Sequence, residues 1–259
     1  MKIANIYPVT NQQLYKDEQY VMILAHLLKK GYYKAENFNE QQYIIMDNGL
    51  FEGEQVSTDL ADLIRLAEDS GIPIKEIIVP DAVNDETKTK ELFRQNLLTI
   101  QEWSHKYTFM FVAQAKTYSE LARNILFINQ FEGALNLSVG ISKLSPLDRA
   151  DFKARQCYKH CKFPVHILGI KDSFKELEKI IGTPNVRGCD TSQLAYMVKN
   201  EGDTFFRPWT YSRKTAEECN AVDPAEAAID LEHDALDMDT LKDLREYFWE
   251  DAKAYGILR

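Results

Sequence analysis

Features that mark export, membrane insertion or a disulfide framework are scarce in this sequence. No window approaches the roughly 18 consecutive apolar residues of a membrane helix, and the N-terminal segment lacks the apolar core of a signal peptide. Among the 259 residues there are only four cysteines, too few for a disulfide-rich fold: Cys157, Cys161, Cys189 and Cys219. We therefore expect reduced thiols, no membrane partner and a cytoplasmic location, meaning the host cytoplasm if a phage encodes the chain.

The sequence also lacks an excess of positive charge. It has 40 acidic and 31 basic residues, a net charge of −9. Residues 221–259 contain 11 of the acidic and 4 of the basic side chains, so the first 220 residues are nearly neutral. We do not expect such a chain to bind nucleic acids broadly, because their phosphates repel an acidic surface. A local basic groove stays compatible with these totals.

What the sequence does contain is a regular alternation of apolar runs and amphipathic segments. Hydrophobic residues make up 45% and charged residues 27% of the chain, which excludes a largely disordered protein. The apolar runs predict strands over residues 3–9, 43–46, 76–79, 108–112, 134–139, 164–168 and 186–189. The segments between them predict helices over residues 17–30, 57–70, 85–106, 118–131, 146–162, 174–181 and 193–200.

This alternation predicts an α/β fold of the (β/α)8 or TIM-barrel type, which need not be regular. The expected strands are almost wholly apolar, as in a parallel sheet covered on both faces. Residues 205–211 could supply the last strand, and an open, doubly wound sheet is the alternative. No linker divides the chain. We expect a barrel over residues 1–220 and an acidic C-terminal helical extension packed on it over residues 221–259, where apolar residues recur at helical spacing: Leu241, Leu244, Tyr247 and Phe248.

Polar residues and glycines follow the ends of the expected strands. In a parallel barrel these ends meet on one face, where active sites are built. Carboxylates gathered there would perturb one another's ionisation, and paired carboxylates suit chemistry at a sugar carbon. Aspartate and glycine also simply terminate strands in many proteins, but the ordered set argues for a site. Its members are Asp47, Asp81, Gln114, Gly140, Gly169 and Asp190.

Six short segments surround these residues. They read Met46-Asp47-Asn48-Gly49-Leu50-Phe51-Glu52, Val79-Pro80-Asp81, Val112-Ala113-Gln114-Ala115-Lys116-Thr117, Ser138-Val139-Gly140-Ile141, His166-Ile167-Leu168-Gly169 and Arg187-Gly188-Cys189-Asp190-Thr191-Ser192. In this order they resemble the tRNA-guanine transglycosylases. They are most similar to the shorter relatives, of phage or genomic-island type, that insert 7-deazaguanine bases into DNA.

The resemblance implies two catalytic residues. Asp190 corresponds to the nucleophile that attacks C1′ of the target nucleoside and displaces guanine, forming a covalent glycosyl-enzyme. Asp47 corresponds to the general base that takes a proton from the incoming base. No cofactor is implied, because the covalent intermediate retains the free energy of the glycosidic bond.

The resemblance also implies a base-binding set. Asp81 and Gln114 correspond to the residues that read the purine edge, because a carboxylate accepts from N–H groups and an amide donates to a carbonyl oxygen. Gly140 corresponds to a backbone contact with the base, and Ile141 adjoins it. Phe51 could stack on the base or belong to the core. His166 joins this set, although a buried histidine on an apolar strand is more often a core residue.

Basic residues that could meet a nucleic-acid backbone lie mostly in one aromatic stretch. Arg207, Arg213 and Lys214 alternate there with aromatic side chains, which suits contacts with phosphates and bases. Lys116, just beyond an expected strand end, is a further candidate. The alternative interpretation of the stretch is a final barrel strand with solvated charges.

Two departures from the family pattern bear on the substrate. Ala115 stands where the family usually has glycine, which would narrow the pocket. Beyond Asp190 the chain has only Cys219 and His233 in place of three cysteines and a histidine, so no zinc site and no other metal is expected. Because the zinc subdomain helps to hold tRNA, its absence favours DNA as the partner.

We therefore expect a pentosyltransferase that replaces guanine in DNA with a 7-deazaguanine derivative. The alternatives are a tRNA-guanine transglycosylase without the zinc subdomain, a nucleoside or nucleotide N-glycosidase, and a purine-binding barrel that is not an enzyme. DNA exchange predicts a basic strip beside the strand ends, whereas a nucleosidase predicts a neutral or acidic mouth. A partner protein or a homodimer is compatible with each.

Overall fold

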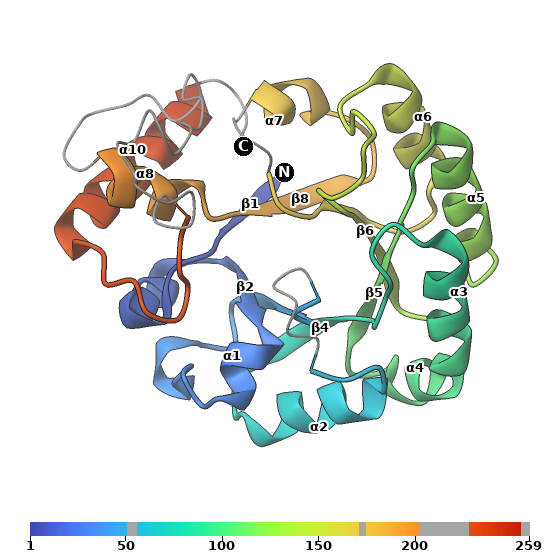
Figure 1. The fold of residues 1–259 in the computed structure, drawn as a ribbon, viewed down its shortest axis with the longest axis horizontal. Coiled ribbons are helices and arrows are strands. Elements are labelled where there is room, and N and C mark those ends of the chain that lie inside the picture. The colour runs from blue at the N-terminus through green and yellow to red at the C-terminus, as the bar shows by residue number, and fades with distance from the viewer. Residues whose placement is uncertain (51–55, 171–174, 202–227, 255–259) are drawn as a thin grey trace.

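Eight parallel strands form one sheet that curves into a nearly closed barrel (Figure 1). The structure is a computed structural model that describes residues 1–50, 56–170, 175–201 and 228–254. The strand order is β1-β8-β7-β6-β5-β4-β3-β2, and every hydrogen-bonded pair of neighbours is parallel. The predicted (β/α)8 fold is thus confirmed, and the open, doubly wound sheet is not observed.

The strands are short, as the lengths of the apolar runs indicated. They are β1 Lys2–Asn5, β2 Tyr20–Leu24, β3 Tyr43–Asp47, β4 Ile74–Ile78, β5 Thr108–Val112, β6 Leu137–Ile141, β7 Val165–Ile167 and β8 Val186–Thr191. Helices surround them (Figure 1), namely α1 Ala25–Lys29, α2 Leu60–Asp69, α3 Glu86–Gln95, α4 Leu97–Trp103, α5 Tyr118–Asn129, α6 Phe152–His160, α7 Lys175–Ile180, α8 Gln193–Glu201 and α10 Met238–Ala254. Two 3-10 helices, η1 Val9–Asp17 and η2 Ala35–Asn37, complete the description. No helix in these ranges is long and apolar enough to cross a bilayer.

The helix predicted over residues 17–30 is wrong. Tyr20–Leu24 is strand β2, which pairs with β3, and only Ala25–Lys29 is helical. All five residues of β2 are buried. A run without a polar side suits a strand that is covered on both faces, whereas a surface helix exposes one side. The eighth strand therefore comes early in the chain, and residues 205–211 lie outside the described ranges.

The long helix predicted over residues 85–106 is interrupted at Asn96. The Asn96 side chain donates to the Leu92 carbonyl oxygen at 2.9 Å and accepts from the Leu60 amide at 2.9 Å. Such local bonds compete with the helical backbone pattern, and the chain divides into α3 and α4 at this residue. The helix predicted from residue 146 begins only at Phe152, where the Asp151 side chain caps it by accepting from the Lys153 amide at 2.8 Å.

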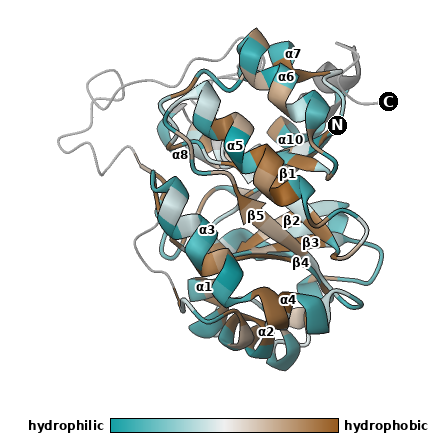
Figure 2. Ribbon diagram, turned by 90° about the vertical axis from the view of Figure 1, so that its right-hand side faces the viewer, coloured by the Kyte–Doolittle hydropathy of each residue, from teal (hydrophilic) through white to brown (hydrophobic). Residues whose placement is uncertain are grey.

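The apolar core has two parts, one between the strands and the helices and one inside the barrel. Figure 2 shows the strands mainly in the hydrophobic colour and long hydrophilic stretches on the surrounding helices. Side chains two apart along a strand share a face, and the barrel interior is filled in this way by Ala4, Ile6, Tyr20, Met22, Ile45, Ile78, Met110 and Val112. These residues form an apolar layer next to the polar residues at the C-terminal ends of the strands.

An ion pair closes the N-terminal end of the barrel interior. Glu76 of β4 is fully buried and contacts the Arg187 guanidinium and the Ser138 hydroxyl. Arg187 also donates to the Tyr43 hydroxyl at 3.0 Å. Strands β3, β4, β6 and β8 thus share one polar cluster, which leaves the opposite end of the barrel for a site.

The described part of the acidic extension lies against the barrel. Helix α10 packs beside α8 with Leu241 and Leu244 buried (Figure 1). The segment before α10 runs along η1, where the Val9 amide donates to the Leu231 carbonyl oxygen at 2.9 Å. This contact brings residues far apart in the sequence to the side of the barrel where β1 and β2 stand.

Candidate active site

A pocket of about 510 Å³ opens at the C-terminal ends of the strands. Its apolar lining includes Ile78 and Val112, which belong to the interior core, and Leu168, which packs against that core. Gly169 of the predicted set lines it, and so do the four polar residues of that set: Asp47, Asp81, Gln114 and Asp190. They come from the ends of β3, β4, β5 and β8, so the barrel gathers carboxylates that are up to 143 positions apart in the chain.

Asp81 is held between two side-chain amides. One carboxylate oxygen accepts from Asn48 Nδ2 at 2.8 Å, and the other accepts from Gln114 Nε2 at 2.6 Å. Only 5% of Asp81 is exposed. Burial raises the pKa of this carboxyl, and the two amide donors partly oppose the shift. The carboxylate plane is thus fixed, with an acceptor edge turned toward the pocket.

The backbone fixes which atoms the two amides present. The Asn84 amide donates to Gln114 Oε1 at 3.0 Å, and the Leu50 amide donates to Asn48 Oδ1 at 2.9 Å. With their oxygens engaged, both side chains must turn their NH2 groups toward Asp81. Gln114 Nε2 keeps a second hydrogen, which can donate to a carbonyl oxygen of a bound ligand.

Asp190 is held in a different way, on the opposite side of the barrel. Its Oδ1 lies 3.0 Å from His166 Nε2, and the Gly169 amide is 3.0 Å from both of its carboxylate oxygens. Gly169 has a φ of 57°, and a Cβ on it would lie 2.5 Å from Lys143 Cδ. The positive φ favours glycine at this position, where the amide reaches the carboxylate, and a larger residue would also have to displace the Lys143 side chain.

Asp47 ends β3 and is less buried than the other two aspartates. Its carboxylate accepts from the Gly49 amide at 3.0 Å, and Gly49 has a φ of 80°. This local turn directs the side chain into the pocket, since Tyr43, Ile45 and Asp47 alternate along one face of the strand. A pocket that presents three carboxylates can bind a donor-rich ligand and move protons on it.

Three members of the expected base-binding set lie beneath the pocket wall. A Cβ on Gly140 would lie 2.7 Å from both Leu168 Cδ1 and Met110 Sδ, and its carbonyl oxygen accepts from the Ala113 amide at 2.8 Å. The Ile141 carbonyl oxygen accepts from Arg149 and from the Leu168 amide. His166 is fully buried behind Asp190. These positions suit packing and support. Gly140, Ile141 and His166 are not among the described residues that line the pocket, and their expected contacts with a base stay predictions.

Of the remaining predicted residues, the structure describes Lys116 alone. Lys116 is exposed and does not line the pocket. Phe51, Arg207, Arg213 and Lys214 lie outside the described residues, so their expected contacts stay predictions.

Several pocket residues escaped prediction from the sequence. His26 follows β2, for which the sequence predicts a helix, and Ser142 follows β6, whose predicted end lies two residues earlier. Asn48 adjoins Asp47, and its place in the same motif was the only signal for it. Nothing in the sequence pointed to residues 228–232, which also line the pocket.

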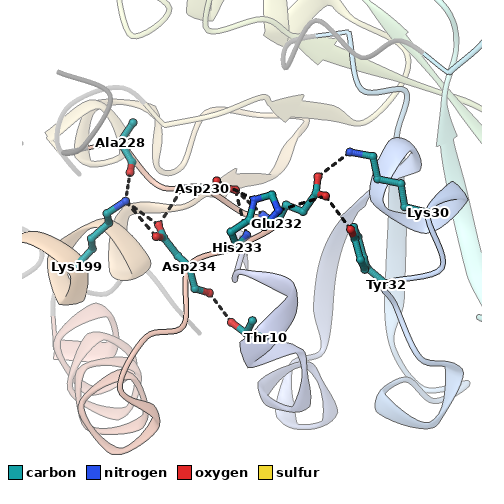
Figure 3. Close-up of polar contacts among 9 residues, drawn as sticks. All are labelled: Thr10, Lys30, Tyr32, Lys199, Ala228, Asp230, Glu232, His233 and Asp234. Carbon is teal, nitrogen blue, oxygen red and sulfur yellow. Dashed lines mark hydrogen bonds and ion pairs between the residues drawn. The ribbon is translucent and has the colours of Figure 1, made fainter. Parts of the chain in front are cut away.

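Residues 228–234 form what we call the C-terminal strap, which side chains from three parts of the barrel hold in place (Figure 3). Glu232 accepts from Lys30 Nζ at 2.6 Å and from the Tyr32 hydroxyl at 2.7 Å, and these bonds lower its pKa. On the other side Lys199 Nζ lies 2.9 Å from Asp234 Oδ2 and 2.5 Å from the Ala228 carbonyl oxygen. The strap is thus fixed at both ends beside the pocket mouth.

The described lining of the pocket is strongly acidic. It contains one lysine, Lys143, against five carboxylates, namely Asp47, Asp81, Asp190, Asp230 and Glu232. Such a lining favours neutral, donor-rich or cationic groups over phosphates. The basic strip expected beside the strand ends is not found among the described lining residues. Within the described ranges, no cluster of three or more His, Cys, Asp or Glu side chains could hold a metal ion.

Comparison with known proteins assigns no family to this chain. No protein-family model matches the chain, and neither does any curated protein. Among solved structures, the tryptophan synthase α subunit from Legionella pneumophila str. Paris is 12% identical and has a TM-score of 0.43, with 96% of this chain and 93% of that chain covered. A tryptophan synthase structure from M. tuberculosis is 10% identical with a TM-score of 0.37, covering 73% and 78% of the two chains. The similarity to transglycosylases therefore stays a prediction from the motifs.

Proposed function

We propose that the protein is a base-exchange transglycosylase that replaces guanine in DNA with a 7-deazaguanine derivative through a covalent aspartyl-glycosyl intermediate. The observation that carries the proposal is the pocket with two buried carboxylates held on opposite sides. The amide-held Asp81 suits base recognition, and the supported Asp190 suits attack on the sugar.

The hydrogen-bonding groups around Asp81 complement the edge of guanine. The N1–H and 2-amino groups of guanine are donors, which Asp81 can accept, and O6 is an acceptor for the second hydrogen of Gln114 Nε2. A 7-deazaguanine presents the same edge, because it differs from guanine at position 7. One set of contacts therefore serves both the departing and the incoming base, as an exchange reaction requires.

The proposed reaction has two displacements at C1′. In the first, an Asp190 oxygen bonds to C1′ while the C1′–N9 bond breaks, and its electron pair leaves with guanine, which takes up one proton. In the second, the incoming base attacks C1′, and the electron pair of the ester bond returns to Asp190. The Asp47 carboxyl gives the leaving guanine its proton in the first displacement. In the second displacement Asp47 takes one proton from the incoming base and so returns to its starting state. Two inversions retain the sugar configuration.

The acidic mouth favours a second candidate, a nucleoside N-glycosidase in which water replaces the incoming base. A nucleoside carries no phosphate, so the five lining carboxylates would not repel it. DNA would instead need basic contacts away from this lining, such as those expected of Arg207, Arg213 and Lys214. A tRNA substrate would need them as well.

An exchange assay separates these functions. The protein is incubated with radiolabelled guanine and, separately, with duplex DNA, single-stranded DNA, tRNA and free nucleosides, with Asp190→Asn as the matched control. Asp190-dependent label in DNA supports the proposal, and label in tRNA alone favours the tRNA exchanger. Release of free base from nucleosides without incorporation identifies the glycosidase. Guanine binding without either reaction identifies a purine-binding barrel.

A further inference from the structure

Behind Asp190 lies a buried chain of two side chains that do not line the pocket. The Tyr20 hydroxyl is 2.8 Å from His166 Nδ1, and His166 Nε2 is 3.0 Å from Asp190 Oδ1. Tyr20 is 4% exposed and His166 is fully buried. Neither residue can reach a bound ligand, so any contribution to the reaction passes through Asp190.

The barrel makes specific room for this arrangement. His166 faces Gly188 across the β7–β8 pair. A Cβ on Gly188 would lie 2.9 Å from Tyr20 Cε1 and 2.8 Å from the Lys2 carbonyl oxygen, so only glycine admits the Tyr20 ring here. The ring also stacks on Tyr43 with centroids 5.6 Å apart. Tyr20 is therefore held rigidly beneath the imidazole.

In one order of donors, the Tyr20 hydroxyl donates to His166 Nδ1 and His166 Nε2 donates to Asp190. Burial raises the pKa of Tyr20 well above its usual value, so the hydroxyl keeps its proton. A hydroxyl that donates to Nδ1 leaves Nε2 to carry the ring proton, and Nε2–H then donates to Asp190. The histidine in this arrangement is neutral, so it orients the Asp190 carboxylate without cancelling its charge.

The same contacts distinguish the two oxygens of Asp190. Oδ1 accepts from His166 and from the Gly169 amide. Among the described groups, Oδ2 accepts only from the Gly169 amide, whose N–H is shared between the two oxygens. The inference rests on the proposed function. We propose that His166 is a positioning residue, that Tyr20 sets its tautomer, and that it orients Asp190 so that Oδ2 attacks C1′. Oδ1 stays bonded to His166 and Gly169 throughout both displacements.

The first test reads the tautomer directly and does not depend on any activity. The full-length protein is labelled with 15N-histidine, and its five histidines are observed by NMR, with His166→Gln used to assign the His166 signal. We expect a neutral ring protonated at Nε2, and in Tyr20→Phe we expect a mixture of tautomers. A wild-type ring protonated at Nδ1, or at both nitrogens, overturns the proposal.

The second test reads the reaction in the same exchange assay. We expect His166→Leu to lower kcat by about 10- to 100-fold, the loss found when residues that orient metal ligands are replaced, with KM for the base within about twofold. His166→Gln keeps an N–H where Nε2 stands and should recover most of the loss, and Tyr20→Phe should lose less than His166→Leu. Equal kcat in wild type and His166→Leu overturns the positioning role.

The two tests separate this inference from the proposed function. If the wild-type protein shows the expected tautomer but exchanges no base, the exchange function fails while the hydrogen-bond chain stands. Suppose instead that the wild type exchanges the base, and that His166→Leu and His166→Gln lose exchange equally while their unfolding temperatures stay unchanged. The orienting N–H is then refuted, while the exchange function stands.

Discussion

At the N-terminal end of the barrel interior Glu76 faces the Arg187 guanidinium, whereas at the C-terminal end Asp81 and Asp190 accept bonds from amides, a backbone N–H and an imidazole. All three carboxylates are at most 5% exposed. The guanidinium neutralises Glu76 within the protein. The groups around Asp81 and Asp190 orient the carboxylates and leave their acceptor edges toward a pocket.

The difference shows how one barrel uses the same functional group for two purposes. A buried carboxylate paired with a guanidinium is satisfied by the fold, and removal of either partner leaves an unpaired buried charge. A carboxylate held by neutral donors keeps a charge that a ligand can use. The two ends should therefore respond in opposite ways to mutation, one in stability and the other in activity.

The largest effect is expected from Asp190→Asn. The amide oxygen can still accept from His166 and Gly169, so the free energy of unfolding should change by less than about 1 kcal/mol. An amide cannot form the glycosyl ester, and guanine exchange should fall by roughly a thousandfold or more. Exchange kinetics and urea denaturation measure the two quantities. Retained exchange would remove Asp190 from the mechanism.

Glu76→Gln should show the opposite pattern. It leaves the Arg187 guanidinium buried without a counter-charge, which destabilises a protein by about 3–5 kcal/mol. The paired change Glu76→Leu with Arg187→Met removes both charges and should recover most of that stability. Exchange per folded molecule should stay within about twofold in each variant. Urea denaturation tests the first expectation, and a small loss in Glu76→Gln would mean that water already reaches the pair.

Asp81→Asn should weaken base binding more than turnover. The new NH2 group would face the NH2 group of Asn48 or Gln114, and it offers one acceptor oxygen where guanine needs two. Hydrogen bonds to a charged group are worth about 1.5–3 kcal/mol, so Kd for guanine should rise roughly 10- to 100-fold. Calorimetric titration with guanine measures it, and adenine, which lacks the donor edge, is the control ligand. Unchanged discrimination between the two bases would exclude Asp81 from recognition.

Asp81 also predicts a pH dependence. Its pKa is raised in the folded protein because it is buried, so the folded state holds this proton more tightly than the unfolded state. Stability should therefore fall as the pH rises from about 4, the usual value, through the raised pKa, and this fall should be absent in Asp81→Asn. Guanine binding should follow the opposite course and weaken as the pH drops through the raised pKa, because the neutral acid accepts less well. Urea denaturation across this pH range compares the two proteins.

The sequence predicted the fold and the main carboxylates because both follow from local patterns. Apolar runs followed by Asp or Gln indicated strand ends, and parallel strands bring those ends together, as Asp47, Asp81 and Asp190 show. Strand β2 was missed because a wholly apolar run of five residues has no period that separates strand from helix.

The rest of the site depends on contacts that no local pattern contains. The positioning role proposed for His166 depends on Tyr20, 146 positions away, and on the space left by Gly188. The space beside Gly140 is filled by Met110 of β5 and by Leu168, which follows β7. Two ion pairs hold the strap beside the pocket. Lys30 binds Glu232, which is 202 positions away, and Lys199 binds Asp234, which is 35 positions away. Glycines and charged residues fit many environments, so their partners emerge only in three dimensions.

The smallest effect is expected at the strap. Asp230 is exposed and lines the pocket mouth, where it lies 3.0 Å from His233 Nδ1. Asp230→Asn removes one negative charge near any approaching phosphate. The affinity for a short single-stranded oligonucleotide should therefore rise by only about two- to threefold at low salt. This gain should vanish at about 1 M salt, where the Debye length is about 3 Å. Asp239→Asn, an exposed carboxylate on α10 that does not line the pocket, is the matched control. Fluorescence anisotropy at the two salt concentrations measures the change. An equal gain in both variants would mean that net charge alone acts. No gain in either variant would mean that nucleic acid does not approach this mouth. That result would favour a nucleoside over DNA as the substrate.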